Sequence, residues 1–380
     1  MDFELTEDLQ LLQQTARDFA NSVLKPAAAR LDREEKFPTE HWKPLADLGF
    51  FGFLVPEEYG GTNLGNVALT LALEEVNRAC ASTGVTVSVQ NSLVAAPLVK
   101  YGTEEQKSKY LPRVVTGDVI GAYAITEPGH GSDAGALETS AALAGDRYVL
   151  NGHKAWITSG ATADLLVVFA TVDRSKGSRG ITAFLVEKSS PGLVVGKHEK
   201  KLGIRGSETV TLALEDVEVP VENVLGVVGK GFNLALSTLD GGRIGIAAQG
   251  AGILAASLED SIRYAGERKQ FGRAIAEFQA IQWKIANMAL DLDTARLLTR
   301  RAAWLKDMGK PHSIEASMAK LFSSEAANRA ATQAVQIHGG AGYCKDFAVE
   351  RYYRDAKITE IYEGTSEIQR MVIARSALGL

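Results

Sequence analysis

The chain has 380 residues, enough for two or three domains and for a hydrophobic core that needs no disulfide or metal ion to stabilise it. Its 41 Lys and Arg residues against 46 Asp and Glu residues give a formal net charge of −5 without any basic tract, so we expect no nucleic-acid binding. With 46% hydrophobic and 23% charged residues the composition is that of a globular protein, and two cysteines without a CxxC pair argue against a disulfide framework.

Neither a secretory signal nor a membrane-spanning helix is predicted, and we expect a cytoplasmic protein. Residues 1–4 carry acidic side chains where a signal peptide would be basic. The longest charge-free run, residues 79–99, has the length of a membrane span but is rich in Ser, Thr, Asn and Gln. The sequence therefore predicts no integral association with a membrane.

The first region, residues 1–118, has the pattern of a helical domain. Thr6 is placed to cap a first helix, because acidic residues follow it and apolar residues then recur at spacings of three and four. We expect Pro26 to end that helix. Further on, Thr103 and Gln106 have the spacing of a capping box that opens another helix.

The second region, residues 119–229, has the pattern of a β-domain. Short runs rich in β-branched and aromatic residues lie between Gly-, Asn- and Pro-containing turn signals. The predicted strands are residues 148–150, 165–170, 181–186 and 209–214. Strands that follow one another without intervening helices predict an antiparallel sheet or a small barrel.

The third region, residues 230–380, returns to the helical period. Apolar residues keep to one helix face over 278–305, and residues 313–338 form a second long, Ala-rich stretch that ends at a pair of glycines. Residues 267–272 are a polar break, and 367–378 predict a last helix. Long helices joined by short loops predict a four-helix bundle, and the whole chain is an α+β multidomain protein in the order α, β, α.

Several motifs that would indicate a particular activity or binding site are incomplete. The glycine-rich stretch 226–231 lacks the Ser or Thr of a phosphate loop, and residues 338–342 resemble an oxyanion loop without any GxSxG nucleophile. No GxGxxG follows a predicted strand, so a Rossmann site is not supported. The six histidines show no metal-ligand spacing, and we expect no metal site.

Four other segments carry residues without an obvious packing role: 123–136, 154–160, 267–272 and 361–370. The first places glycines and hydroxyl groups after a strand, an arrangement that suits a flat polar ligand or a phosphate. Simpler interpretations stand beside these. Trp156 in a strand is more often a core residue, and a Glu such as Glu363 before a helix is normally a surface residue that complements the helix dipole. The residues alone therefore indicate candidate ligand loops.

Together these segments resemble the acyl-CoA dehydrogenase family. The segment 124–136 (AITEPGHGSDAGA) is similar to one family signature, and 336–343 (QIHGGAGY) with the downstream Asp and Arg residues is similar to a second. His130 departs from the family, which usually has a small residue or Asn there. The resemblance covers essentially the whole chain and implies a helical N-terminal domain, a middle β-domain and a C-terminal four-helix bundle, assembled as a homotetramer.

The resemblance also implies an FAD enzyme that converts a saturated acyl-CoA to the trans-2-enoyl-CoA. Glu363 would remove the α-proton, the β-hydrogen would leave as hydride to flavin N5, and an electron-transferring flavoprotein would accept the electrons. A carboxylate can act in this way in a dry site while the thioester carbonyl is polarised. Residues 88–93 and 239–249 look most like short-chain, butyryl-type members.

The same resemblance carries over residue by residue to binding positions, some of which would contact the FAD of a neighbouring subunit. The positions that match FAD contacts are Tyr123, Ile125, Thr126, Gly131, Ser132, Trp156, Ile157, Thr158, Arg268, Phe271, Gln279, Gln336, Gly339, Gly340, Thr365 and Glu367. Those that match acyl-CoA contacts are Ser132, Asp240, Arg243, Tyr362 and Gly364.

Alternative functions remain open at this point. Within the family, a short branched-chain or a medium-chain acyl-CoA dehydrogenase differs mainly in the depth of the acyl pocket, where one methylene is worth only about 1–3 kcal/mol of discrimination. An acyl-CoA oxidase or a nitroalkane oxidase would use the same fold and FAD but reduce oxygen. A non-catalytic helical interaction module would bind no flavin.

Overall fold

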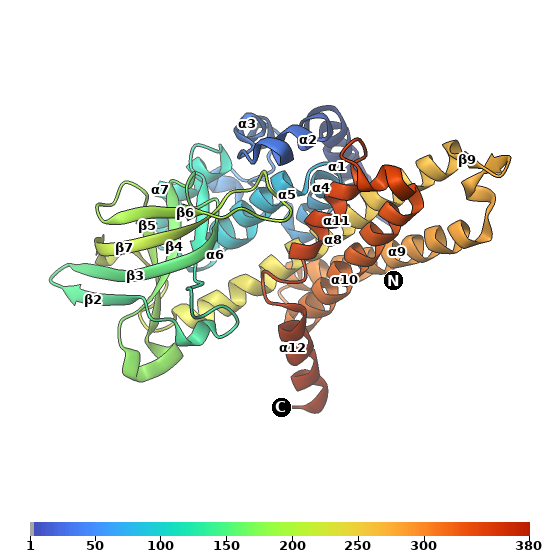
Figure 1. Ribbon diagram of the computed structural model, residues 1–380. Helices are drawn as coiled ribbons and strands as arrows, with labels where there is room; N and C mark the ends of the chain where they lie inside the picture. The colour runs from blue at the N-terminus through green and yellow to red at the C-terminus, as the bar shows by residue number, and fades with distance from the viewer. Residues whose placement is uncertain (1–3) are drawn as a thin grey trace.

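A computed structural model describes residues 4–380 and has the predicted order of helices, sheet and helices. The sheet lies at one end of the molecule and the long C-terminal helices at the other, with the N-terminal helices packed across both (Figure 1). The N-terminal helices are α1 (Glu7–Phe19), α2 (Lys25–Glu34), α3 (Thr39–Asp47), α4 (Gly65–Ala79), α5 (Ala81–Ser88), α6 (Ala96–Tyr101) and α7 (Glu104–Val115), with π-helical turns at Ala20–Leu24 and Val89–Ala95.

Two capping predictions in this region are confirmed, and one helix end is wrong. Thr6 accepts a hydrogen bond from the Leu9 amide, and Thr103 and Gln106 form both bonds of a capping box. Pro26, however, does not end the first helix. A π-helical turn follows α1, and Pro26 lies in the first turn of α2, where its missing N–H has no intrahelical partner to lose.

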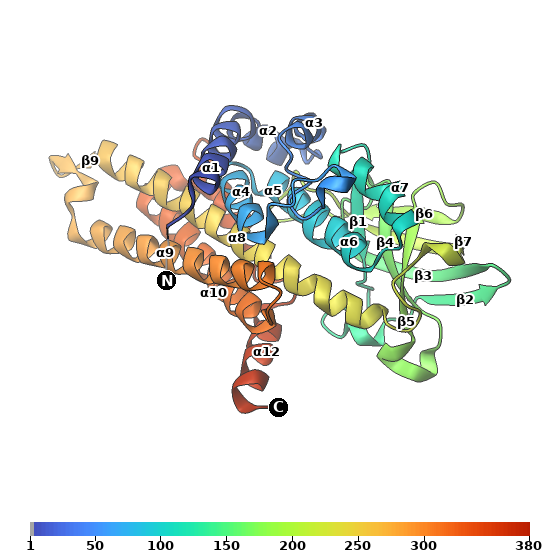
Figure 2. The same ribbon diagram turned by 180° about the vertical axis from the view of Figure 1, so that it is seen from behind.

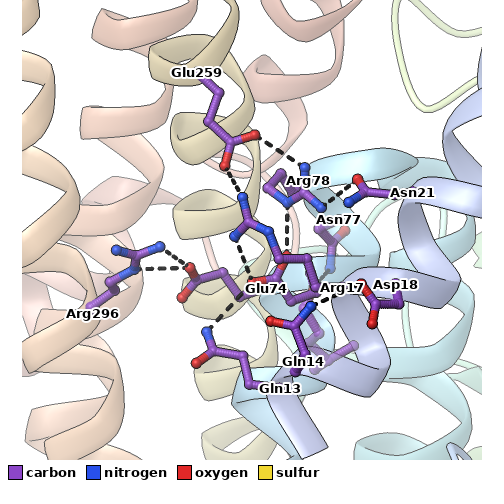
Figure 3. Close-up of polar contacts among 12 residues, drawn as sticks. Gln13, Gln14, Arg17, Asp18, Asn21, Glu74, Asn77, Arg78, Glu259 and Arg296 are labelled. Carbon is purple, nitrogen blue, oxygen red and sulfur yellow. Dashed lines mark hydrogen bonds and ion pairs between the residues drawn. The ribbon is translucent and has the colours of Figure 1, made fainter. Parts of the chain in front are cut away.

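A charged cluster ties the N-terminal helices to the C-terminal ones. Arg78 of α4 is buried and donates to Glu75 at 2.8 Å and to Glu259 at 3.1 Å, while Arg17 of α1 donates to the same Glu259 at 2.6 Å. On the other side Arg296 donates to Glu74 (Figure 3). Because buried charges are tolerated only when paired, this cluster constrains how α1, α4, α8 and α9 pack.

The middle region is one large sheet. Its strands are β1 (Gly121–Ala124), β2 (Ser140–Ala144), β3 (Arg147–Thr158), β4 (Leu165–Thr171), β5 (Ile181–Glu187), β6 (Leu193–His198), β7 (Thr209–Pro220) and β8 (Val224–Leu225), ordered β6-β7-β3-β2-β4-β5-β8. Most pairs are antiparallel as predicted, but β1 pairs in parallel with β4, as does one end of β2. The long connection that a parallel pair requires is supplied by β2 and β3, which lie between β1 and β4 in the chain.

Three long helices dominate the C-terminal region. They are α8 (Gly231–Glu267), α9 (Gln279–Asp307) and α10 (Ser313–His338), and the shorter α11 (Val349–Ile358) packs against α8 and α10. The polar break at 267–272 is confirmed as the start of a small hairpin, β9 (Lys269–Gln270) and β10 (Arg273–Ala274). The last helix, α12 (Ser366–Leu378), contacts α10 and projects from the body with the C-terminus at its free end (Figure 1 and Figure 2).

The hydrophobic core is divided into separate clusters beneath these layers. One cluster joins α6, α7, β1, β4 and β5, a second joins α1–α4, and a third fills the space between α8, α9, α10 and α11. No helix among residues 4–380 is long and apolar enough to cross a membrane.

Candidate active site

Glu363 lies in the turn between α11 and α12, in an unusual backbone conformation. Its φ is 56° and that of the next residue, Gly364, is 90°, so two consecutive residues have left-handed φ values. For a glutamate this conformation is costly, and it persists only where the surroundings hold it. The turn directs the carboxyl group onto α8, where a Cβ atom at Gly242 would lie 2.4 Å from Glu363 Oε2.

The carboxyl group lies against this helix, and its Oε2 atom is buried. Glu363 Oε2 is inaccessible to solvent and accepts no hydrogen bond from any of residues 4–380. Burial raises the pKa of Glu363 to about 7, although the positive charges of Arg243 and Lys320 act in the opposite direction. A carboxylate with a pKa near neutrality and a free oxygen has the properties of a general base.

Other predicted site residues surround this carboxyl group. Tyr123 of β1 is buried and Tyr362 is half-buried, and after burial the charge of Glu363 is the next cause that raises the pKa of each phenol. Arg243 donates to Asp240 Oδ1 at 2.8 Å, while its own Nε is buried without a partner within residues 4–380. The structure thus brings Tyr123, Asp240, Arg243, Tyr362 and Gly364 together around Glu363.

The segment after β1 is fixed from beneath by a buried ion pair that the sequence did not reveal as important. Lys154 of β3 is fully buried, and its Nζ donates to Glu127 Oε1 at 2.8 Å and to the Ile125 carbonyl at 3.2 Å. Glu127 also accepts both N–H and O–H bonds from Thr139. Burial lowers the pKa of Lys154 to about 8 despite the charge of Glu127. The pair attaches the Thr126 segment to β3.

Trp156 is not a core residue. The pairing of β3 with β7 is interrupted between Lys154 and Ile157, and Trp156 has a φ of 59° at this bulge. Bulges redirect side chains, and here the indole is 61% exposed while Ile157 beside it is buried. An exposed aromatic ring therefore stands beside the Ile125–Thr126 end of the neighbouring segment, since the Ala155 amide donates to the Thr126 carbonyl.

A second group of predicted residues gathers at the far end of the long helices. Stacking of Tyr264 on His338, with ring centroids 4.1 Å apart, holds the end of α8 against the end of α10. Phe271, at the hairpin tip, is 92% exposed, and a Cβ atom at Gly339 or Gly340 would have no neighbouring atom of residues 4–380 within 4 Å. The exposed members of this group are Arg268, Phe271, Gln279, Gln336, Gly339 and Gly340.

Within one chain the structure does not bring these two groups together. The hairpin at the α8–α9 turn lies at the opposite end of the molecule from the sheet that carries Trp156 (Figure 1). This separation agrees with the expectation that the second group serves the site of a neighbouring subunit. Which ligand each position contacts stays a prediction.

The remaining predicted positions lie near the first group or at helix ends. Gly131 and Ser132 are exposed beyond the Glu127 turn, and Thr158 is half-buried at the end of β3. Thr365 caps α12 by accepting from the Ile368 amide, and Glu367 lies exposed in the first turn. His130, the departure from the family pattern, lines a separate depression of about 440 Å³ together with Glu138, His153 and Arg174.

The roles of two important residues could not be foreseen because they depend on contacts between distant segments. Gly242 leaves room for Glu363, and Lys320 of α10 is fully buried and donates to the Gly364 carbonyl at 2.7 Å. The available signal for Gly242 was a pair of glycines inside a helical region, which lowers helix stability and so indicates a tertiary reason for their presence. Lys320 gave no local signal, because lysine is a good helix former and only its burial, which the sequence does not show, is unusual.

Comparisons with known proteins agree with this geometry. Family models described as the N-terminal, middle and C-terminal domains of acyl-CoA dehydrogenase match residues 6–118, 122–217 and 229–378. The mitochondrial short-chain specific acyl-CoA dehydrogenase of Mus musculus is 54% identical over 98% of this chain and 90% of that protein. Butyryl-CoA dehydrogenase from Megasphaera elsdenii matches with a TM-score of 0.98 at 44% identity over all of both chains. A chain in a structure described as an electron transferring flavoprotein of Acidaminococcus fermentans matches with a TM-score of 0.98 at 48% identity, also over the full length of both.

Proposed function

The chain belongs to the acyl-CoA dehydrogenase family, and from this premise we propose that it oxidises a short straight-chain acyl-CoA to the trans-2-enoyl-CoA, with Glu363 as the base. It is an FAD-dependent oxidoreductase. The observation that carries the proposal is the Glu363 carboxyl group, which is buried, has a pKa raised to about 7 and has no donor to Oε2 among residues 4–380.

The raised pKa matters because the α-hydrogen of a thioester is a weak acid. A base works best when its pKa lies near the working pH, since it is then both ionised and strong enough to remove the proton. Glu363 Oε2 would receive that proton, and the left-handed turn directs the oxygen away from its own backbone onto α8. Bound acyl-CoA would cover the carboxylate further, and the lost hydration would strengthen the base.

The residues present fit FAD. The outward ring of Trp156 and the exposed Phe271 provide flat surfaces for an aromatic ligand, and the open backbone at Gly339 and Gly340 suits a diphosphate. Trp156, Thr126 and Thr158 would hold the flavin ring, and Arg268, Gln279 and Gln336 of a neighbouring subunit would hold the remainder. When bound, FAD would supply the hydride-accepting chemistry that the side chains of the protein lack.

Packing along α8 supports a short acyl chain. A Cβ atom at Gly245 would lie 2.4 Å from Ser88 Oγ, and Gln249 accepts a hydrogen bond from the Tyr362 hydroxyl. Positions 242 and 249 differ by seven residues and share one helix face about 10 Å apart. An acyl chain that ran along this face from Glu363 would therefore meet polar, closely packed groups within a few carbons.

The test is the visible spectrum of the purified protein under anaerobic conditions, before and after butyryl-CoA is added. We expect flavin bands that bleach while a charge-transfer band appears at longer wavelength. Flavin that bleaches instead with a branched or an eight-carbon acyl-CoA would reject the short straight chain. A protein that binds no flavin, even after FAD is added, would reject the enzymatic function.

The electron acceptor is a separate part of the proposal. We expect an electron-transferring flavoprotein, which is supported by the match to a chain from the Acidaminococcus fermentans structure. Trp156 is 61% exposed, so a flavin held against it would be close to the protein surface. Turnover that consumes oxygen without an added acceptor would identify an oxidase instead.

We further propose a homotetramer. Along α9 the exposed side chains Trp283, Leu290, Leu297 and Trp304 recur every seven residues and form an apolar stripe. Large exposed apolar stripes mark interfaces, and a second copy of the chain would also complete the FAD site described above. Light scattering after gel filtration tests this assembly. The cytoplasmic location stays a prediction.

A further inference from the structure

Polar side chains on one face of α10 hold the carbonyl groups around the catalytic turn. Asn328 donates to the Ala356 carbonyl at 3.0 Å, Ser324 to the Thr359 carbonyl at 2.8 Å, and Lys320 to the Gly364 carbonyl at 2.7 Å. These donors are spaced four residues apart, so they lie on one side of α10 in successive turns. They satisfy the free carbonyls at the end of α11 and reach as far as the residue after Glu363.

Lys320 differs from the other two donors because it brings a charge. The side chain is fully buried, and burial lowers its pKa to about 8, so it is still protonated at neutral pH. A buried ammonium group is expensive unless it is paired with an opposite charge or fully hydrogen-bonded. The Gly364 carbonyl is its one hydrogen-bond acceptor among residues 4–380.

The charged and titratable groups around the pair come from several elements. Glu363 is the largest attraction on Lys320, and Glu360 and Glu367 add smaller ones, while Arg243 of α8 repels it. Arg243 and Lys320 are the two positive charges that act on Glu363, and the phenols of Tyr123 and Tyr362 face the same carboxylate. Lys320 is therefore one of two cations that favour the ionised form of the base.

We propose that Lys320 is a positioning residue for Glu363, one that acts in two ways. Its hydrogen bond fixes the Gly364 carbonyl and hence the left-handed turn that directs the carboxylate onto Gly242. Its charge stabilises the ionised, proton-accepting form of that carboxylate. This inference rests on the proposed role of Glu363 as the base.

Gln369 is an uncharged donor to the same turn and can be compared with the charged Lys320. Its buried amide also donates to the Gly364 carbonyl, at 2.9 Å, and to the Glu363 carbonyl, at 3.3 Å. The turn thus has a neutral donor beside the charged one. Loss of the Lys320 charge should consequently change the titration of Glu363 more than it changes the fold of the turn.

Two substitutions separate the charge from the hydrogen bond. Lys320→Met keeps the length and removes both, while Lys320→Gln removes the charge and keeps a donor. We expect both variants to raise the pKa of Glu363 by about one unit, because a neighbouring opposite charge lowers the pKa of an acid by at least that much. At pH 7 this shift would cut the ionised fraction of Glu363, and the rate of flavin reduction, about fivefold, and the loss should recover at higher pH.

The decisive measurement is an infrared titration of the resting holoenzyme, with glutamate carboxyl groups labelled with carbon-13. Each spectrum is subtracted from that of the matching Glu363→Gln protein, so the signal belongs to this carboxyl group and needs no substrate. Ser324→Ala is the matched control, because it removes the neighbouring hydrogen bond without a change of charge. An unchanged Glu363 pKa in both Lys320 variants, or an equal shift in Ser324→Ala, would overturn the proposal. Failure of the wild-type enzyme to oxidise any acyl-CoA would instead reject the proposed function.

Discussion

Glu127 and Glu363 are two glutamates with buried carboxyl groups whose pKa values are shifted in opposite directions. Glu127, in the middle region, accepts bonds from Lys154 at 2.8 Å, from the Glu138 amide at 2.6 Å and from Thr139. Burial acts to raise the pKa of Glu127, but Lys154 and the hydrogen bonds outweigh burial and leave the pKa lowered. Glu363 also has a buried lysine nearby, yet that lysine bonds to a backbone carbonyl, and the pKa of Glu363 is raised to about 7.

The difference lies in where the donors are directed. Around Glu127 four donors bond to the carboxylate: the Lys154 ammonium, the Thr139 hydroxyl and the amides of Glu138 and Thr139. The group is consequently held as an anion that joins the end of β1 to β3. Around Glu363 the donors of Lys320 and Gln369 hold backbone carbonyls, and no donor in the described part of the chain reaches Oε2. The first arrangement stabilises structure, and the second keeps a proton acceptor available.

The largest effect is expected from Glu363→Gln, which removes the acceptor and keeps the shape of the side chain. Flavin reduction by butyryl-CoA should slow by about 10²- to 10⁴-fold, the usual contribution of a general base. Bound FAD and the urea unfolding midpoint should not fall. Rapid-mixing absorbance at the flavin band measures the rate. Substantial remaining activity would mean that another acid, with Glu360 the nearest in sequence, removes the proton.

Removal of one partner of the Lys154–Glu127 ion pair should mainly lower the free energy of unfolding. Lys154→Met leaves Glu127 as an uncompensated buried anion, and such losses typically cost about 3–5 kcal/mol. Urea unfolding followed by far-UV circular dichroism measures the change. The double variant Glu127→Gln with Lys154→Met is the control, since removal of both charges should recover part of the loss. If the double variant is no more stable than the single one, the ion pair is not the cause.

A smaller effect is expected on how the free energy of unfolding depends on pH. The pKa of Glu363 is raised from 4.5 to about 7, so burial penalises the ionised form. Below pH 4.5 the group is protonated in both folded and unfolded chains and there is no penalty. As pH rises through 4.5–7 the unfolded chain releases the proton more readily, and stability falls. Relative to wild type, Glu363→Gln should therefore gain up to about 3 kcal/mol between pH 4.5 and pH 8.

That comparison uses urea midpoints of the two proteins over the same pH series. A difference that stays constant with pH would contradict the raised pKa of Glu363. Asp355, whose pKa burial raises to about 6, titrates in both proteins and so cancels in the difference.

The smallest effect on stability is expected from an ion pair whose two side chains are exposed to solvent. Lys43 and Asp47 form an ion pair at 2.8 Å on α3, with side chains 70% and 62% exposed. Exposed pairs contribute little because water and salt screen them. Lys43→Met should leave the urea midpoint unchanged within error. A clear loss would show that burial is not what distinguishes the Glu127 pair.

The parts of the fold that sequence could predict are those with regular local patterns. The apolar face at 278–305 and the Ala-rich stretch 313–338 correspond to α9 and α10, because the 3.6-residue period is visible without tertiary information. Pro26 was misjudged because proline ends a helix but is equally favourable in a first turn. The parallel pairing of β1 depends on a partner more than 40 residues away. The domain limits at 118 and 229 stay predictions.

For the site, Glu363 could be identified only through family resemblance. Its conformation, its burial against Gly242 and the donors of α10 come from segments far apart in the chain, which no local pattern relates. The simpler interpretations of Trp156 as a core residue and Glu363 as a surface residue were wrong for the same reason. A bulge exposes the first side chain, and a left-handed turn buries the carboxyl group of the second.

The missing side chain at Gly242 has a consequence for sequence variation. A Cβ atom there would occupy the space that the Glu363 carboxylate fills. The residues tolerated at position 242 therefore depend on the residue at position 363. In a library randomised at position 242, only glycine should survive selection for activity while position 363 remains glutamate. Tolerance at 242 should return once position 363 is shortened, although the base is then gone.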